Sequence, residues 1–351
     1  MTWPRKLTRW LVALVVLHGI VAGAGFLAPY DPVEQDRDHP YLPPMRVHLM
    51  DAQHHFHSRP FFYPLRLREG SFDQYQEDTA AAVSLRFFMR GADYPLLGFV
   101  PCRWRLFGTD GARIYLLGSD AYGRDQLSRI LFGGQVSLLA GLLGAGVTLF
   151  LGALIGMTAG YYGGWRDDFL MRAAELFLAL PWLYLLFALR AFLPLTVSPL
   201  EAFLLVVVVI GMVGWARPAR LVRGVALSVK ERDFVRAARG FGASDSYLLR
   251  RHILPETASV LLTQAAILVP QFVLAEMTLS FLGLGVPEPM SSWGNLLASL
   301  QQYSVLVSYW WMYLPALAIV PFFLGYLGLA SALQRRSSPY KIDEQSSWSP
   351  T

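Results

Sequence analysis

Charged residues are scarce in this chain of 351 residues, and their scarcity excludes an ordinary soluble fold. They make up 16% of the sequence, while hydrophobic residues make up 54%. A typical soluble domain is about a quarter charged. The polar surface is too small to cover a globule in water, so the apolar side chains must face another environment. The same composition excludes a disordered chain, a collagen-like repeat and a disulfide-stapled miniprotein.

Cysteine and lysine are almost absent. The single cysteine, Cys102, cannot form an internal disulfide, so cysteine usage does not indicate the redox compartment. The only lysines are Lys6, Lys230 and Lys341, and none follows a glycine. A phosphate-binding loop needs Gly-Lys-Ser or Gly-Lys-Thr, because its lysine reaches the phosphates. The chain cannot hydrolyse ATP by that chemistry, and any ATP-driven role requires a separate ATPase chain.

Motifs of other enzymes are also missing. The sequence contains neither the His-Glu-x-x-His motif of zinc proteases nor the Gly-x-Ser-x-Gly nucleophile elbow. No convincing catalytic pair lies within the apolar stretches. We therefore expect no catalytic residues, no cofactor and no enzyme activity in this chain.

Long stretches without charge predict membrane-spanning helices. A bilayer core about 30 Å thick needs about 20 apolar residues of helix, and backbone groups in hydrocarbon must be satisfied within the segment. Four charge-free runs and two shorter or briefly interrupted apolar stretches predict six helices, at about 9–29, 135–160, 170–194, 201–219, 258–283 and 309–333. The expected fold class is an all-α membrane protein with six transmembrane helices.

Basic residues predict the orientation of these helices. Residues 215–255 hold nine arginines and lysines, whereas the 195–200 and 284–308 connections hold none. Further basic residues flank the first and last helices, at Arg5, Lys6, Arg9, Arg335 and Arg336. Because cytoplasmic loops are enriched in Lys and Arg, we expect a membrane protein with both termini in the cytoplasm.

The first predicted span has a second interpretation. Its basic start and the Ala22-Gly23-Ala24 sequence also suit a cleaved signal peptide. The apolar stretch is longer than the usual 7–15 residues of a signal peptide, so a retained anchor is favoured. The expected organisation is then a tail and first helix at 1–29, an insert at 30–118, a transmembrane domain at 119–334 and a tail at 335–351.

The 30–118 insert is expected to form a small extracytoplasmic domain of short strands and turns. It contains five of the seven histidines, His39, His48, His54, His55 and His57. Neighbouring imidazoles can bind Ni, Cu or Zn. No cysteine ligand set or regular histidine spacing of a known site accompanies them, so solvated loop histidines are favoured and no metal site is predicted.

The basic loop at 230–255 has the composition of a docking element. Its small residues let another backbone approach closely, and they are Ala237, Ala238, Gly242 and Ala243. Ser244 or Asp245 is suited to cap a new helix at 246–252, and Pro255 is expected to reset the chain before the next span. A basic hairpin held by anionic lipid is the alternative. Two short helices around a glycine turn explain the small and aromatic residues better.

These residues resemble the cytoplasmic loop of permease subunits in binding-protein-dependent ABC importers. The consensus is Glu-Ala-Ala, three residues, Gly, nine residues, Ile, one residue and Leu-Pro. The matching positions are Ala237, Ala238, Gly242, Leu254 and Pro255, while Arg236 replaces Glu and His252 replaces Ile. Both departures are common in the branch for oligopeptides, dipeptides and nickel. The stretches 117–129, 160–167 and 276–294 also resemble that branch.

The resemblance implies a type I ABC importer permease fold in the bacterial inner membrane. It implies an assembly of two permease subunits, two ABC ATPase subunits and an extracytoplasmic solute-binding protein, with a paralogue favoured as the second permease. The assembly lies in membrane lipid and has no nucleic-acid partner. The loop would couple to the ATPase through Ala237, Ala238, Gly242, Ala243, Ser244, Leu254 and Pro255. The implied function is an importer subunit that forms the pathway for peptides or similar small solutes. The alternative is a secondary transporter or channel that works without an ATPase, with ionisable residues along its pathway.

Two features inside the predicted spans complete the expectations. Small residues recur at every fourth position of the second span, at Ala140, Gly144, Thr148, Gly152, Gly156 and Gly160. They predict close packing of a neighbouring helix more readily than a pore lining. Arg190 and Glu276 fall at a similar depth near the outer boundary. Either Arg190 snorkels to the headgroups, or the two pair and help to close an outer gate.

Overall fold

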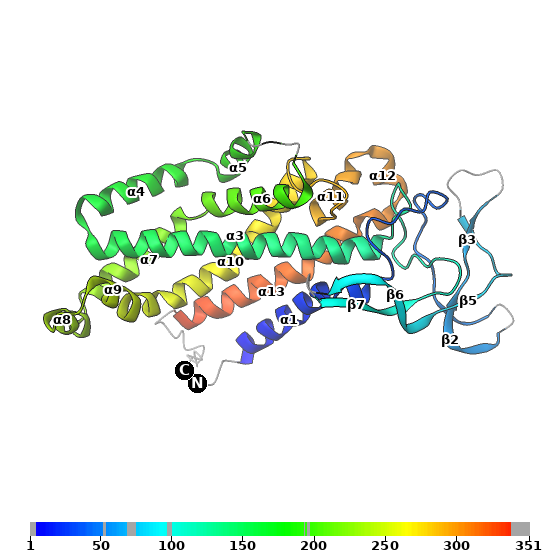
Figure 1. Ribbon diagram of the computed structural model, residues 1–351, viewed down its shortest axis with the longest axis horizontal. Helices are drawn as coiled ribbons and strands as arrows, with labels where there is room; N and C mark the ends of the chain where they lie inside the picture. The colour runs from blue at the N-terminus through cyan, green and yellow to red at the C-terminus, as the bar shows by residue number, and fades with distance from the viewer. Residues whose placement is uncertain are drawn as a thin grey trace, which may run out of the picture.

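The protein is a bundle of long helices with a β-rich insert at one end (Figure 1). This computed structural model describes residues 5–51, 54–68, 75–96, 100–192, 194 and 197–337. The central helix is α3 (Gln126–Tyr162), which contacts α6 (Pro199–Val213), α7 (Ala216–Lys230) and α10 (Leu254–Phe281). Around this centre lie α1 (Arg5–Ala22), α2 (Ala24–Leu27), α4 (Gly164–Ala179), α5 (Trp182–Ala191) and α13 (Leu314–Ser337).

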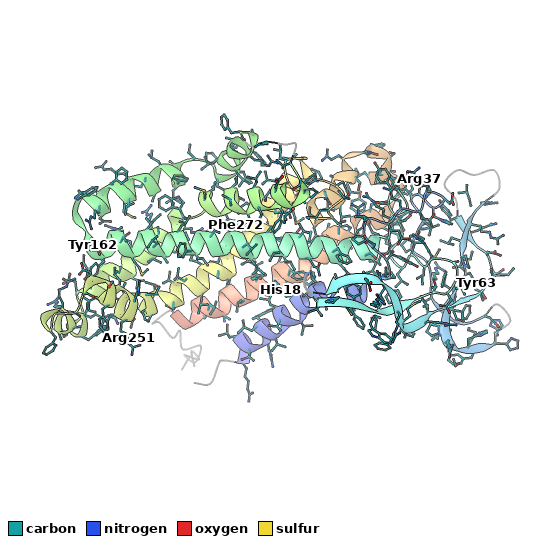
Figure 2. The ribbon with its side chains drawn as sticks, in the orientation of Figure 1. His18, Arg37, Tyr63, Tyr162, Arg251 and Phe272 are labelled. Carbon is teal, nitrogen blue, oxygen red and sulfur yellow. The ribbon has the colours of Figure 1, made fainter. Side chains whose placement is uncertain are left out.

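The shorter helical elements lie at the two ends of the bundle (Figure 1). At the end opposite the insert are α8 (Asp233–Gly240), α9 (Asp245–Leu248) and the π-helical turn η1 (Leu249–Ile253). Between α10 and α13 the chain forms α11 (Trp293–Ala298), η2 (Ser299–Gln301), α12 (Tyr303–Ser308) and η3 (Trp310–Tyr313). Figure 2 shows Phe272 within the bundle, Tyr63 in the insert and Arg251 at the opposite end.

The apolar helices support a membrane protein, but the count of six spans stays a prediction. Among the described residues, three helices are long and apolar enough to cross a bilayer, at 126–162, 245–281 and 310–335. The number rises to five if each of two bent helix pairs is one span. α1 is not among them, because three of its eighteen residues are the basic Arg5, Lys6 and Arg9.

The third predicted span is divided, so the expectation of one helix at about 170–194 is wrong. α4 ends at Ala179 and α5 begins at Trp182, and their axes differ by 92°. Pro181 explains the break, because a proline disfavours helical backbone at the preceding residue. Leu180 accordingly takes an extended conformation.

The fourth predicted span, 201–219, is also two helices. α6 and α7 meet at 45° at Gly214 and Trp215. Pro218 lies one turn after the bend and has no N–H to donate to the Gly214 carbonyl, which weakens the helix there. A Cβ added at Gly214 would lie 2.6 Å from the Phe272 ring, so the bend also brings this backbone close to α10.

The insert contains the expected strands, all paired antiparallel. One sheet joins β1 (His48–Met50), β2 (Phe56–Phe62) and β5 (Val83–Ser84). Two hairpins are formed by β3 (Leu65–Leu67) with β4 (Tyr75–Glu77), and by β6 (Arg86–Leu96) with β7 (Val100–Gly108). Its own core includes Leu42, Phe62, Ile114 and Tyr115. The placement of the insert outside the membrane stays a prediction.

Histidines of the insert lie beside carboxylates. His57 Nε2 is 3.0 Å from an Asp51 carboxylate oxygen, and His39 Nδ1 is 3.0 Å from Asp36. Among the described residues, no group of three or more His, Cys, Asp or Glu side chains could hold a metal ion.

The small residues of α3 lie against α6 and α7. Thr148 Oγ1 donates to the Gly211 carbonyl at 2.7 Å. A Cβ at Gly152 would lie 2.7 Å from Pro218, and one at Gly156 would collide with the Ala219 carbonyl. A Cβ at Gly160 would lie 2.7 Å from the Arg223 carbonyl. These contacts make the backbone of α7 the neighbour of this face.

Candidate functional site

The α8–α9 segment (Asp233–Ile253) forms two short helices around a glycine turn at one end of the bundle (Figure 1). Gly242 has φ +82°, in the left-handed region. Its N–H donates to the Arg239 carbonyl at 3.0 Å, and the Ala243 N–H donates to the Ala238 carbonyl at 3.1 Å. This pair of bonds is a Schellman motif, which ends a helix with a glycine.

The Schellman motif gives a physical reason for three small residues of the loop. Gly242 is needed for its backbone conformation, since nothing lies within 4 Å of a Cβ built on it. Ala238 and Ala243 are partly buried and pack on one apolar cluster. They occupy the two positions of the motif that commonly make a hydrophobic contact.

Ser244 is the N-cap of α9, as one of the two predicted alternatives. Its hydroxyl accepts from the Tyr247 N–H at 3.4 Å. The carboxylate of Asp245 accepts a hydrogen bond from the Tyr161 hydroxyl at the end of α3. Lys230 Nζ donates to the Gly160 carbonyl at 2.8 Å. Asp245 therefore ties the start of α9 to the end of α3, and Lys230 ties the end of α7 to the same place.

The inner face of the α8–α9 segment is buried in the end of the bundle. Val235, Leu248 and Ile253 are each 0% exposed. They pack on Tyr161, Ala226 and Val229 from α3 and α7. Full burial of such side chains contributes about 1.5–3 kcal/mol each, so the segment is seated firmly.

The outer face of the same segment exposes aromatic side chains. Phe241, in the turn, is 92% exposed, while Phe234 and Tyr247 are 44% and 52% exposed. Ala237 is also exposed. An apolar surface on a fixed turn is a typical site of contact with another protein.

The predicted break at Pro255 is wrong. α9, η1 and α10 run on as one helix of 37 residues, Asp245–Phe281. Pro255 lies in the first turn of α10, where a missing N–H is tolerated. The π-helical turn just before it is a local adjustment of the helix. Leu254, 40% exposed, lies at the same junction. The α8–α9 segment is therefore continuous with a long apolar helix.

Arg190 and Glu276 are both buried near the insert end, at 1% and 0% exposure. Arg190 donates to the carbonyls of Leu284, at 2.5 Å, and Pro194, at 3.1 Å. Glu276 accepts from the Ser280 hydroxyl at 2.6 Å, and Ser280 in turn accepts from the Val286 N–H. Both charged groups therefore hold the turn that follows α10. Their direct pairing stays a prediction.

A buried charge network at the insert end was missed at the level of sequence. Arg124 lies 2.7 Å from Asp120 and 2.8 Å from Glu288, and Arg129 lies 2.5 Å from Glu288 and also contacts Asp120. Asp120, Arg124 and Arg129 are buried, while the Glu288 side chain is 44% exposed. The network joins the start of α3 to the turn after α10. Its members lie in the stretches 117–129 and 276–294 that carry the resemblance. Charged residues next to long apolar runs are the sequence feature that could have indicated such a network.

Asp125 caps the first turn of α3 beside this network. Its carboxylate accepts from the Ser128 N–H at 2.7 Å and the Ser128 hydroxyl at 2.6 Å. Asp125 is 2% exposed. Burial raises the pKa of this carboxyl to about 6 against the opposing effect of its hydrogen bonds.

Known proteins similar to this chain are permeases of peptide transport systems. The oligopeptide transport system permease protein OppC of Haemophilus influenzae is 37% identical over 216 residues, 61% of this chain and 67% of OppC. OppC of Escherichia coli K12 is 39% identical over 216 residues, 61% of this chain and 69% of the relative. The dipeptide permease protein DppC of Bacillus subtilis is 32% identical over 223 residues, 63% and 68% of the two chains.

A solved structure and a family model also match. A chain of the MetNI methionine ABC transporter in an inward-facing conformation superposes with a TM-score of 0.45 and 16% identity, over 60% of this chain and 96% of that one. The family model described as "Binding-protein-dependent transport system inner membrane component" matches residues 152–339, which include α7, the α8–α9 segment and α10. The chain belongs to this family of inner-membrane transport components.

Proposed function

We propose that this chain, a permease subunit of an ATP-driven importer, carries peptides or similar small solutes. The support is the similarity to the OppC and DppC permeases, which are named for oligopeptide and dipeptide transport. The chain has no Gly-Lys-Ser or Gly-Lys-Thr sequence of its own. The energy of ATP therefore enters through a separate ATPase subunit.

The α8–α9 segment is the proposed contact with that ATPase. The observation that carries this proposal is Phe241, which is 92% exposed on a turn whose other side is buried in the bundle. Burying one such side chain in a cleft is worth about 1.5–3 kcal/mol. Because α9 continues into α10, a displacement of the turn by the ATPase would move the helix that carries Glu276.

The proposed orientation puts the α8–α9 segment and both termini in the cytoplasm. The insert then lies outside, where it contacts the solute-binding protein, and a second permease subunit, a paralogue, completes the pathway. Cys102 in β7 provides a probe of this orientation. Its thiol is partly buried, and the hydrogen bond from Tyr94 lowers the pKa of the thiol. An impermeant maleimide should label it in intact spheroplasts, and labelling only after permeabilisation would reverse the orientation.

Arg190 and Glu276 are proposed to help close the outer end of the pathway. Both hold the turn after α10, Arg190 through Leu284 and Glu276 through Ser280. Neutralising either one should impair solute uptake or assembly. Exchange of the two charges, Arg190→Glu with Glu276→Arg, should restore part of the loss if they pair directly. Unchanged uptake in both single variants would make these charges incidental to the gate.

The experiment for the function as a whole is solute uptake by the reconstituted complex. Uptake of a labelled peptide into proteoliposomes should require ATP and the ATPase subunit. Gly242→Arg should abolish coupling while membrane insertion stays intact, because arginine strongly disfavours the left-handed backbone and adds bulk to the turn. Gly224→Arg, at an exposed helical position of α7 with open space around it, is the matched control. Uptake without the ATPase would instead indicate a secondary transporter or channel.

A further inference from the structure

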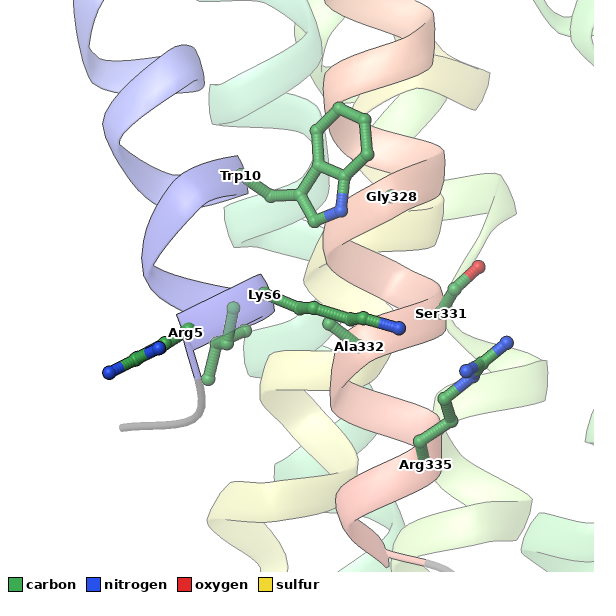
Figure 3. A pocket seen from close by; sticks show the side chains of 8 residues that line it. Arg5, Lys6, Trp10, Gly328, Ser331, Ala332 and Arg335 are labelled. Atoms are coloured by element: carbon green, nitrogen blue, oxygen red, sulfur yellow. The ribbon is translucent and has the colours of Figure 1, made fainter. Parts of the chain in front are cut away.

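A cavity of about 570 Å³ lies between α1 and α13 at the end of the bundle opposite the insert. Its lining comes from the first turns of α1 and the last turns of α13 (Figure 3). The eight lining residues are Arg5, Lys6, Leu7, Trp10, Gly328, Ser331, Ala332 and Arg335. None of the features proposed above for coupling or gating lies in this cavity.

Close packing of α1 and α13 fixes the upper wall of the cavity. A Cβ at Gly328 would collide with the Trp10 indole, and one at Gly325 would lie 2.7 Å from Leu14. One turn further on, the Tyr326 hydroxyl lies 3.1 Å from His18 Nε2. The two helices are thus held together above Trp10, and the cavity begins where this packing ends.

The lining is strongly cationic. It contains Arg5, Lys6 and Arg335, and none of its eight residues is acidic. Figure 3 shows Lys6 extending from α1 toward α13, on which Arg335 lies, while the Arg5 side chain extends from α1 in the opposite direction. All three cationic side chains belong to exposed residues. Lys6 and Arg335 carry like charges on the two helices that border the cavity, so an anion placed between them would relieve their repulsion.

The position of the cavity relative to the bilayer indicates which anion it would take. α1 and α2 together run from Arg5 to Leu27, about 33 Å at 1.5 Å per residue. This length is close to the hydrocarbon thickness of about 30 Å. In the predicted span formed by α1 and α2 together, Arg5 and Lys6 would lie at headgroup depth. Trp10 lies just above them, at the depth where aromatic belts occur.

Above the cavity the same two helices present apolar side chains outward. The exposed residues of α1 are Val12, Val15, Val16 and Ile20, and those of α13 are Leu317, Val320, Leu324 and Leu327. A diacyl lipid could thus place its chains on this surface and its phosphate among the cations below. A free phosphate would gain only the second of these contacts.

We propose that this cavity binds the headgroup of an anionic phospholipid, with cardiolipin as the best match. Lys6 and Arg335 offer one cation for each of the two phosphodiesters of cardiolipin, and basic pockets between helices on the cytoplasmic side are a known mode of binding for its headgroup. Trp10 borders the site, while the Ser331 hydroxyl donates to the Leu327 carbonyl of its own helix at 2.9 Å. The bound lipid would bridge α1 to α13 below their packed turns and so fasten the first helix to the last.

The test is native mass spectrometry of the full chain in detergent. The probes are tetraoleoyl cardiolipin, dioleoyl phosphatidylcholine and inorganic phosphate. Cardiolipin should bind at least tenfold more tightly than phosphatidylcholine. Lys6→Gln should weaken cardiolipin binding about fivefold and Lys6→Gln with Arg335→Gln about 25-fold, because each cation near an anionic surface contributes about 1 kcal/mol.

The matched control is Arg251→Gln, which removes an exposed cation at the same end of the bundle but outside the cavity (Figure 2). Its cardiolipin affinity should equal that of the unmodified chain. Since Lys6 and Arg335 are both exposed, the double variant should keep its unfolding midpoint in the absence of lipid. Equal binding of cardiolipin and phosphatidylcholine, or equal loss in Arg251→Gln, would overturn the site. Displacement of cardiolipin by inorganic phosphate at a similar concentration would contradict the lipid proposal and show that the cavity is a simple anion site.

Discussion

Gly242→Ala is the sharpest probe of the α8–α9 segment, because the structure separates its conformational effect from any steric one. Nothing lies within 4 Å of a Cβ at Gly242, yet its φ is +82°. Gly240, two residues earlier, also has open space around it but lies in α8. The same substitution at the two positions should therefore have opposite effects.

The expected magnitudes follow from the backbone alone. Left-handed backbone costs a residue with a Cβ about 1–2 kcal/mol, and alanine recovers about 0.4–1 kcal/mol by restricting the unfolded chain. The net cost at Gly242 is about 1 kcal/mol, while alanine at helical Gly240 stabilises by about 0.5–1 kcal/mol. Gly242→Asn should cost less than Gly242→Ala, since asparagine tolerates this conformation.

The assay is hydrogen–deuterium exchange of the reconstituted complex, followed in peptides that cover residues 238–248. The Gly242 and Ala243 amides, which donate the two bonds of the Schellman motif, should exchange about fivefold faster in Gly242→Ala. They should exchange more slowly than in the unmodified chain in Gly240→Ala. ATP-driven uptake should fall in the first variant and persist in the second. Equal exchange rates in the two variants would refute the conclusion that Gly242 is required for the left-handed backbone of the Schellman motif.

Three other predictions concern packing and charge. Gly156→Leu should lower the free energy of unfolding by more than about 3 kcal/mol, beyond ordinary overpacking, because the new side chain meets the Ala219 backbone. Gly146→Leu, on the same helix with open space around it, should leave the free energy of unfolding in detergent almost unchanged. Arg129→Gln should lower the free energy of unfolding by about 3 kcal/mol, because Asp120 and Glu288 then keep Arg124 as their shared arginine. Arg103→Gln, which removes an exposed ion pair with Asp93, should change the unfolding midpoint little. Asp125 has a folded-state pKa of about 6, above its ordinary 3.8, so its stabilising effect is full below about pH 4 and is lost as pH rises through about 6. Asp125→Asn should remove that pH dependence of the unfolding midpoint. A variant whose midpoint varies with pH as in the unmodified chain would contradict the role of Asp125.

The sequence predicted the apolar helices and the glycine turn, because each depends on residues close together in the chain. The charge-free run around α3 and the spacing of Ala238, Gly242 and Ala243 are local patterns with direct physical meaning. The bends at Pro181 and Pro218 were signalled by prolines. Hydropathy does not reveal such bends, because it depends on the length and composition of an apolar stretch and not on the direction of the helix axis.

The remaining features depend on contacts between distant segments. Arg124 and Glu288 are 164 residues apart, and Trp10 meets Gly328 across almost the whole chain. No local pattern indicates such partners. The partners of Arg190 illustrate the same limit: equal depth suggested Glu276, while the structure shows carbonyls of Leu284 and Pro194, which no charge pattern reveals.

Site-specific photo-crosslinking tests the central claim, that the α8–α9 segment contacts the ATPase. A benzophenone amino acid replaces Phe241 in one variant and Phe56 in the other, both highly exposed but at opposite ends of the molecule. In the purified importer complex, position 241 should crosslink to the ATPase subunit, identified by peptide mass spectrometry, and position 56 should not. Crosslinking to the ATPase from position 56, or none from position 241 in a complex that hydrolyses ATP in response to solute, would contradict the account.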